Sequence, residues 1–139
     1  MVSLFRAVFC ILTIAVFASC ELSKHKEVAF QSVEAFRRQI SEGKLSDIYF
    51  AAAPAMKTAV TEADFVKLLG AVRGRLGAFK SADLTGWRAD SGAGRSFVVL
   101  TYKSDFERGS AAEEFTFTLS GNGAQLQDYK IDSPALITN

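Results

Sequence analysis

The stretch that most constrains the fold runs from residue 97 to residue 131, where three strands are predicted. Residues 97–102 are rich in β-branched and aromatic side chains, and residues 114–119 alternate strictly between polar and apolar side chains. The Gly-Asn-Gly sequence at 121–123 favours the positive φ angles of a tight hairpin, before residues 126–131 return as the last strand. This pattern predicts a sheet with one buried face.

Another strand is expected before this stretch, over residues 79–89. A bulge at Thr85–Gly86 would place Leu84 and Trp87 on the same core face. Residues 104–112 are expected to form a polar connection between two of the strands, with a turn near residues 108–110.

Three helices are predicted upstream of the sheet. The first spans about residues 24–42, because apolar residues recur on one face at helical spacing, and its opposite charged face is expected to be solvated. That charged face carries Glu34, Arg37 and Arg38. A short helix follows near residues 48–50, and Thr61–Asp64 resembles a capping box that opens a third helix ending at Gly77.

Helices followed by strands with short connections indicate an α+β fold. The N-terminal helices are expected to pack on one face of a four-stranded antiparallel sheet. We expect residues 28–133 to form a single domain, with a C-terminal tail at 134–139.

The N-terminus differs in kind from this domain. In residues 1–19, Arg6 precedes an apolar run that is too short to span a bilayer and ends in small residues. We interpret residues 1–19 as a signal peptide and the polar residues 20–27 as a tether between membrane and domain.

Cys20 follows this segment at once, and Phe17-Ala18-Ser19-Cys20 resembles the lipobox of bacterial lipoproteins. In those proteins the cysteine is lipidated and becomes the mature N-terminus. The alternative is ordinary cleavage after Ala18, which would leave Cys20 as an incidental thiol and the protein soluble in the periplasm or secreted. Cys10 leaves with the signal, so Cys20 has no intramolecular disulfide partner.

The charge balance bears on partners. The chain has 16 Lys and Arg residues, so loss of Arg6 leaves 15 against 15 Asp and Glu. This balance argues against nucleic acid as a partner, and membrane attachment would have to come from the lipid. Glu21 is not the aspartate associated with inner-membrane retention, which favours the periplasmic face of the outer membrane over that of the inner one.

No catalytic, metal or cofactor motif is found. His25 is the only histidine and lies in the predicted tether, which argues against a Ser-His-Asp site and a zinc site. Glu113 and Glu114 are adjacent, so in a strand they point to opposite faces and cannot act as a pair.

A ligand pocket between sheet and helices is the remaining candidate site. Its expected residues are amphipathic aromatics and one carboxylate on the first strand, namely Tyr49, Asp83, Trp87, Tyr102 and Tyr129. Asp83 facing an apolar cavity could serve as a base, but an exposed aspartate and ordinary core aromatics are the simpler interpretation.

A set of mostly structural residues resembles the domain-of-unknown-function family 4019. They are Tyr49, 53–57, 65–77, Leu84, Trp87, Tyr102, Ser104, Phe106, Glu113, Phe115, Phe117, Tyr129, Ile131 and Ser133. The resemblance covers about Val28 to Ser133. It implies a small exported bacterial protein with a cone of helices on a curved antiparallel sheet, similar to nuclear transport factor 2-like and cystatin-like domains. It implies no catalytic residues.

Three functions therefore stand as hypotheses. The first is an exported lipoprotein whose non-catalytic domain binds an envelope protein or a small apolar ligand. The second is a small pocketed enzyme, isomerase- or hydrolase-like, using Asp83 or Tyr102, which only fold analogy suggests. The third is a structural subunit with an exposed apolar patch.

Overall fold

The structure is a computed structural model that describes residues 2–121 and 123–137, with side chains from Leu22 onward. Met1 of the predicted signal peptide, Asn122 of the predicted turn and residues 138–139 of the predicted tail lie outside the described residues.

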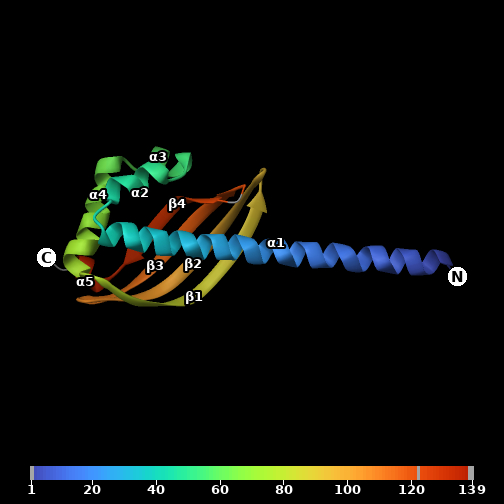
Figure 1. Ribbon diagram of the computed structural model, residues 1–139. Coiled ribbons are helices and arrows are strands. Elements are labelled where there is room, and N and C mark those ends of the chain that lie inside the picture. Colours follow the sequence, from blue (N-terminus) through green and yellow to red (C-terminus); the bar gives the residue numbers. More distant parts are fainter. Residues whose placement is uncertain (1, 122, 138–139) are drawn as a thin grey trace.

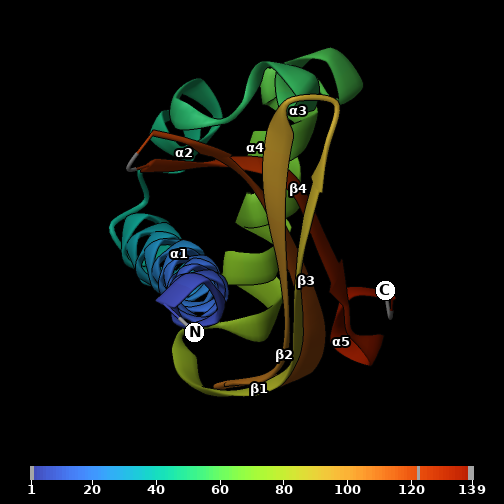
Figure 2. The same ribbon diagram turned by 90° about the vertical axis from the view of Figure 1, so that its right-hand side faces the viewer.

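Helices come first and strands second, which confirms the predicted α+β class (Figure 1). The elements are α1 (Val2–Ser41), α2 (Leu45–Ala51), α3 (Pro54–Ala59), α4 (Glu62–Ala71), the π-helical turn η1 (Val72–Leu76), β1 (Phe79–Gly92), β2 (Arg95–Phe106), β3 (Gly109–Ser120), β4 (Gly123–Asp132) and α5 (Pro134–Ile137). The strands form one antiparallel sheet in the order β1-β2-β3-β4. Viewed along α1, this helix and α4 lie on the same side of the strands (Figure 2). The likeness to nuclear transport factor 2-like or cystatin-like cones stays a prediction.

Helix α1 begins far earlier than the predicted start near Lys24. It runs without a break from Val2 to Ser41, so the predicted tether at 20–27 is helical. The physical reason is that the chain has no glycine or proline between these residues, and nothing interrupts the helical hydrogen bonds. Gly43, with φ +75°, then ends the helix as expected.

The core lies between α1, α2, α4 and the inner face of the sheet. The apolar stripe of α1 contributes Ala29, Val33 and Phe36, all nearly inaccessible to solvent, and the ring of Phe36 packs edge-on against Phe115 at 5.1 Å between centroids. Phe115 is fully buried, as the alternation in β3 predicts. One buried face therefore organises the sheet.

The predicted bulge in β1 is confirmed. The register with β2 shifts between Leu84 and Gly86, and Leu84 and Trp87 lie opposite Tyr102 and Leu100, which face the core. Both side chains are nevertheless 37% and 40% exposed, because β1 is an edge strand that no helix fully covers.

The predicted polar connection over residues 104–112 is wrong. Strands β2 and β3 continue to Phe106 and from Gly109, leaving only Glu107 and Arg108 in the turn. Alternation persists through this segment, since Ser104, Ala111 and Glu113 are buried while Lys103 and Ala112 are exposed. Because Ser104 and Glu113 are polar although they lie on the inner face, the hydrophobic pattern did not indicate that the strands extend this far.

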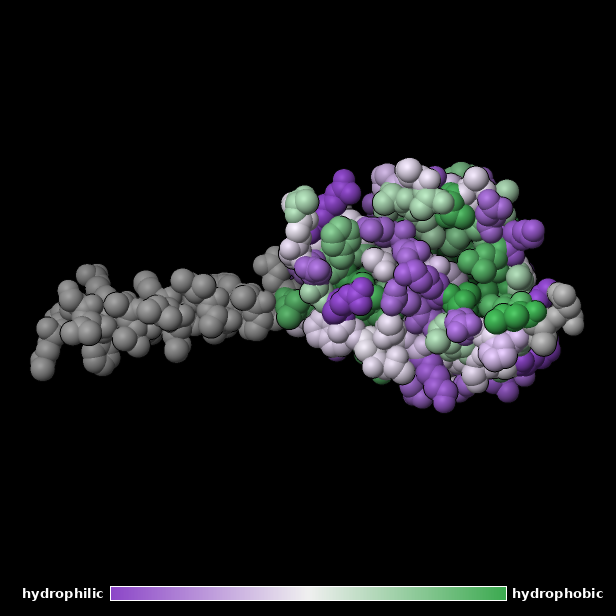
Figure 3. All heavy atoms as spheres, turned by 180° about the vertical axis from the view of Figure 1, so that it is seen from behind, coloured by the Kyte–Doolittle hydropathy of each residue, from purple (hydrophilic) through white to green (hydrophobic). Residues whose placement is uncertain are grey.

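The outer face of the sheet carries hydrophilic side chains over its middle (Figure 3). Lys130 of β4 forms ion pairs with Glu114 at 3.2 Å and with Asp128 at 3.3 Å. The helix-facing side is therefore the side on which a sheltered site can form.

Candidate functional site

The side chain of Arg37 points from α1 toward the inner face of the sheet. Only 9% of it is exposed, so the prediction that it lies on a solvated face is wrong. The arginine side chain is long, so its guanidinium can reach a neighbouring strand from a position beside the apolar stripe of the helix. Glu34, 68% exposed and 3.2 Å away, is the outer partner of this guanidinium.

The inner partner is Glu113 of β3, which is buried. Its Oε2 accepts a hydrogen bond from Oγ of Ser104 at 2.5 Å and lies 3.4 Å from Nη2 of Arg37. Its Oε1 accepts a hydrogen bond from the phenol of Tyr129 at 2.7 Å. Several donors thus satisfy the buried carboxylate, as a charged group away from water requires.

Aromatic rings complete the surroundings of the guanidinium. Its carbon lies 4.3 Å from the centroid of Phe79 and 4.7 Å from that of Tyr102, within cation–π range. Among the described residues, Nε of Arg37 has no hydrogen-bond partner although it is buried. An unpaired buried N–H is costly, so an acceptor that reached this atom would offset that cost.

The two tyrosines of this cluster stay neutral over a wide pH range. Burial, with the Glu113 carboxylate and the hydrogen bond to it as further causes, raises the pKa of Tyr129 well above its ordinary value. Burial also raises the pKa of Tyr102 to about 12, despite the opposing charge of Arg37. Both phenols are therefore neutral near neutral pH, and that of Tyr129 donates its hydrogen bond to Glu113.

A cavity of about 700 Å³ opens beside this cluster, within the size range of small-molecule sites. It lies where the C-terminal half of α1 meets η1, the start of β1 and the β2–β3 turn, and Arg37 and Glu113 line it. Its apolar lining comprises Phe36, Ile40, Val72, Ala78, Phe79 and Phe106.

Charges at the cavity are mixed. Four arginines and three glutamates line it. Arg108 is already engaged, because its Nε and Nη2 donate to the carbonyls of Arg75 and Gly74 at 3.0 and 2.6 Å. Arg73 donates to the carbonyl of Ser41 at 3.4 Å. The arrangement suits a ligand with an apolar body and one hydrogen-bond acceptor directed at Arg37.

The predicted pocket residues do not gather at one site. Tyr102 and Tyr129 lie at the Arg37 cluster. Tyr49 is buried beneath the helices, where its phenol donates to the carbonyl of Val60 at 2.9 Å. Trp87 lies under Lys26, and Asp83 is exposed opposite Lys103 of β2. None of the five lines the cavity itself.

Sequence reasoning missed Arg37, Ser104 and Glu113. The alternation of β3 contained a usable signal, because Glu113 shares the parity of Phe115 and Phe117 and so belongs on the buried face. A carboxylate there needs hydrogen-bond donors or a cation beside it, but the sequence does not indicate which element supplies them. Nothing in the sequence marked the cavity.

The described residues contain no group of three His, Cys, Asp or Glu side chains placed to hold a metal ion. Within the part of the chain whose side chains are described, no helix is long and apolar enough to cross a membrane.

Comparison with protein-family models identifies the family of this chain. Neither the curated proteins nor the solved structures contain a match to this chain. The model of a family described as "Protein of unknown function (DUF4019)" matches residues 32–125, which include Arg37, Ser104 and Glu113. The match spans well over half of the sequence and confirms the resemblance seen in it, so the chain belongs to the DUF4019 family.

Proposed function

We propose that this protein is an exported lipoprotein whose α+β domain is a non-catalytic binding module of the bacterial envelope. The ligand is a small molecule with an apolar body and a hydrogen-bond-accepting or anionic end. It occupies the cavity between α1, η1 and the β2–β3 turn.

The unpaired Nε of Arg37 carries the ligand proposal. It belongs to a buried side chain that lines the cavity, beside the apolar rings of Phe79 and Phe106. A bound acceptor would satisfy this N–H, and an apolar body would cover the neighbouring rings. The carboxylate of Glu113 offsets much of the positive charge of the Arg37 guanidinium. The site therefore favours a ligand with a single acceptor over a multiply charged anion.

The export and anchoring proposal comes from the N-terminal pattern. The short apolar segment followed at once by Cys20 supports lipidation, and Glu21 leans towards the outer membrane. Cleavage after Ala18 is the competing outcome and would give a soluble periplasmic or secreted binding protein with the same cavity.

The enzyme hypothesis is less well supported. Asp83, its candidate base, is exposed at the edge strand and does not line the cavity. The buried carboxylate of Glu113 is occupied by Ser104, Tyr129 and Arg37, which suits it to holding the arginine in place. These positions favour binding over acid–base chemistry.

A cavity-filling variant tests the ligand site. Ala78 lines the cavity, so Ala78→Trp should fill it, while Ala63→Trp places the same side chain on the exposed surface of α4. The probe is 8-anilinonaphthalene-1-sulfonate, an apolar molecule with one anionic group. We expect the wild type and Ala63→Trp to bind it saturably with the same affinity, and Ala78→Trp to lose that binding. Equal binding by all three proteins would refute the site.

The anchor is tested separately by replacing the cysteine. Cys20→Ser should move the protein from the membrane fraction of its own cells to the soluble fraction. Unchanged fractionation would rule out lipidation as the means of attachment and would leave the cavity proposal untouched.

A further inference from the structure

We infer that one end of the domain rests in the headgroup layer of the membrane, with Trp87 at the interface. This membrane-proximal rim consists of Leu22, Lys24, Lys26, Trp87, Arg88 and Arg95. The inference rests on the proposed lipidation of Cys20 and adds the orientation of the domain and the lipid surface that it touches.

The continuous helix limits how far the domain can stand from the membrane. Cys20 and Lys26 lie on the same unbroken helix α1, so the six residue steps from one to the other rise only about 9 Å along its axis. The polar headgroup layer is about 5–7 Å thick on each side of the hydrocarbon core. A helical segment of this length holds the first domain residues next to that layer.

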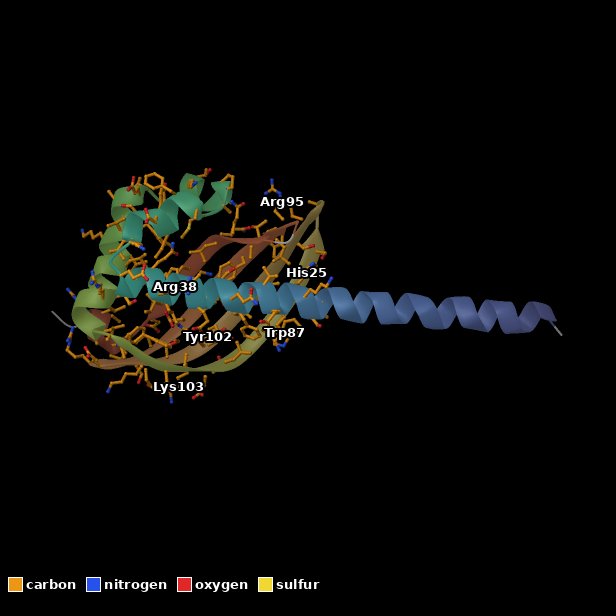
Figure 4. All side chains as sticks on the ribbon, in the orientation of Figure 1. His25, Arg38, Trp87, Arg95, Tyr102 and Lys103 are labelled. Carbon is orange, nitrogen blue, oxygen red and sulfur yellow. The ribbon has the colours of Figure 1, made fainter. Side chains whose placement is uncertain are left out.

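The strands reach toward the membrane from the same end. Figure 1 shows the β1–β2 hairpin at the end of the sheet nearer the N-terminal half of α1, with its strands crossing the helix obliquely. Figure 4 places His25, Trp87 and Arg95 toward this end of the domain, whereas Arg38 and Lys103 lie farther from it.

The side chains of the rim suit an interface between water and lipid. Trp87 is 40% exposed and Leu22 45% exposed, which leaves apolar surface in contact with solvent. The Nζ atom of Lys26 lies 4.7 Å from the ring centroid of Trp87, so an aromatic ring and a cation are presented together. Tryptophan at headgroup level and flanking Lys or Arg are typical of membrane interfaces.

The charges of the rim are predominantly positive. The rim has Lys24, Lys26, Arg88 and Arg95, and the acidic residues nearest to them in the sequence are Glu21, Glu27 and Asp90. Glu27 accepts from Gln31 at 3.1 Å and Asp90 accepts from the backbone N–H of Ser91 at 2.8 Å. Phosphate groups of anionic phospholipids are the chemistry that complements this surface.

The test uses Trp87, the only tryptophan of the chain, as its own reporter. The mature protein extracted from its cells is reconstituted into vesicles of phosphatidylethanolamine and phosphatidylglycerol, with or without lipids bearing a headgroup nitroxide. Flotation reports attachment, and quenching reports contact of Trp87 with headgroups. We expect the protein to float, its emission to shift to shorter wavelength relative to detergent, and most of its fluorescence to be lost in nitroxide vesicles.

Charge-reversal variants supply the matched comparison. Arg88→Glu with Arg95→Glu should reduce the quenching, whereas Lys67→Glu with Lys103→Glu, equally exposed but outside the rim, should leave it unchanged. Floating protein with unquenched Trp87 would overturn the rim and leave the proposed lipoprotein intact. Protein that does not float would overturn both.

Discussion

Replacing Glu113 tests whether the buried Arg37 cluster holds the domain together. Glu113→Ala removes the carboxylate that accepts from Ser104 and Tyr129 and pairs with Arg37. It leaves a guanidinium that is only 9% exposed without its inner partner. Breaking a buried ion pair by removing one partner costs about 3–5 kcal/mol. That is a large part of the roughly 5–15 kcal/mol that stabilises a typical domain.

The control removes the other carboxylate from the same arginine. Glu34 pairs with Arg37 at 3.2 Å but is 68% exposed, so Glu34→Ala should cost less than about 1 kcal/mol. Urea unfolding of both variants, followed by circular dichroism, gives the two free energies of unfolding. Equal free energies within about 0.5 kcal/mol would refute the reasoning.

A less disruptive variant guards against failure to fold. Glu113→Gln keeps an acceptor for Tyr129 and nearly the same volume, so its cost should lie between those of the two alanine variants. Replacing both Arg37 and Glu113 by methionine should cost less than the sum of the single replacements, because no unpaired charge then remains buried.

Four further predictions concern stability. Gly70→Ala should raise the free energy of unfolding by about 1 kcal/mol, because nothing lies within 4 Å of the added Cβ. Gly77→Ala should lower it by about 1–3 kcal/mol, because φ is +77° and the Cβ would meet a side-chain oxygen at 2.6 Å. For either variant, a change of the opposite sign in urea unfolding would contradict its prediction. Thr61→Ala removes the oxygen that caps α4 and should lower the free energy of unfolding by about 1 kcal/mol, which is measured as a lower urea midpoint. An unchanged midpoint would count against this cap. Folding raises the pKa of Tyr102 to about 12 and also raises the pKa of Tyr129, so both phenols ionise at lower pH in the unfolded chain than in the folded one. The free energy of unfolding should therefore hold below pH 10 and fall as the pH rises toward 12. In urea unfolding at a series of pH values, the free energy of unfolding should fall less steeply for Tyr129→Phe than for the wild type. An identical fall would show that ionisation of Tyr129 does not cause it.

The sequence was sufficient for the class of fold but not for the site. Periodicity places Val33 and Phe115 in the core, because one helical stripe and one strand face are buried. The capping residue Thr61 was also readable, since its side chain accepts from the backbone N–H of Asp64 as a local motif requires. Such features depend on residues close together in the chain.

The site depends on contacts across the chain. Arg37 and Glu113 are 76 residues apart, and only the packing of α1 on β3 brings them together. Hydrophobic patterning assigned Arg37 to the solvated flank of its helix, because it ignores how far a long side chain can reach. The cavity arises from the meeting of α1, η1 and the β2–β3 turn, and no single segment encodes it.

The most direct test of an anchored binding module is a native mass spectrum of the protein, extracted in mild detergent from its own cells, repeated under denaturing conditions. We predict a polypeptide that begins at Cys20 and carries a lipid mass that survives denaturation. A further mass, lost on denaturation, should reveal the ligand of the cavity. An unmodified polypeptide that begins at Ser19 with nothing bound would contradict both the anchor and the binding function.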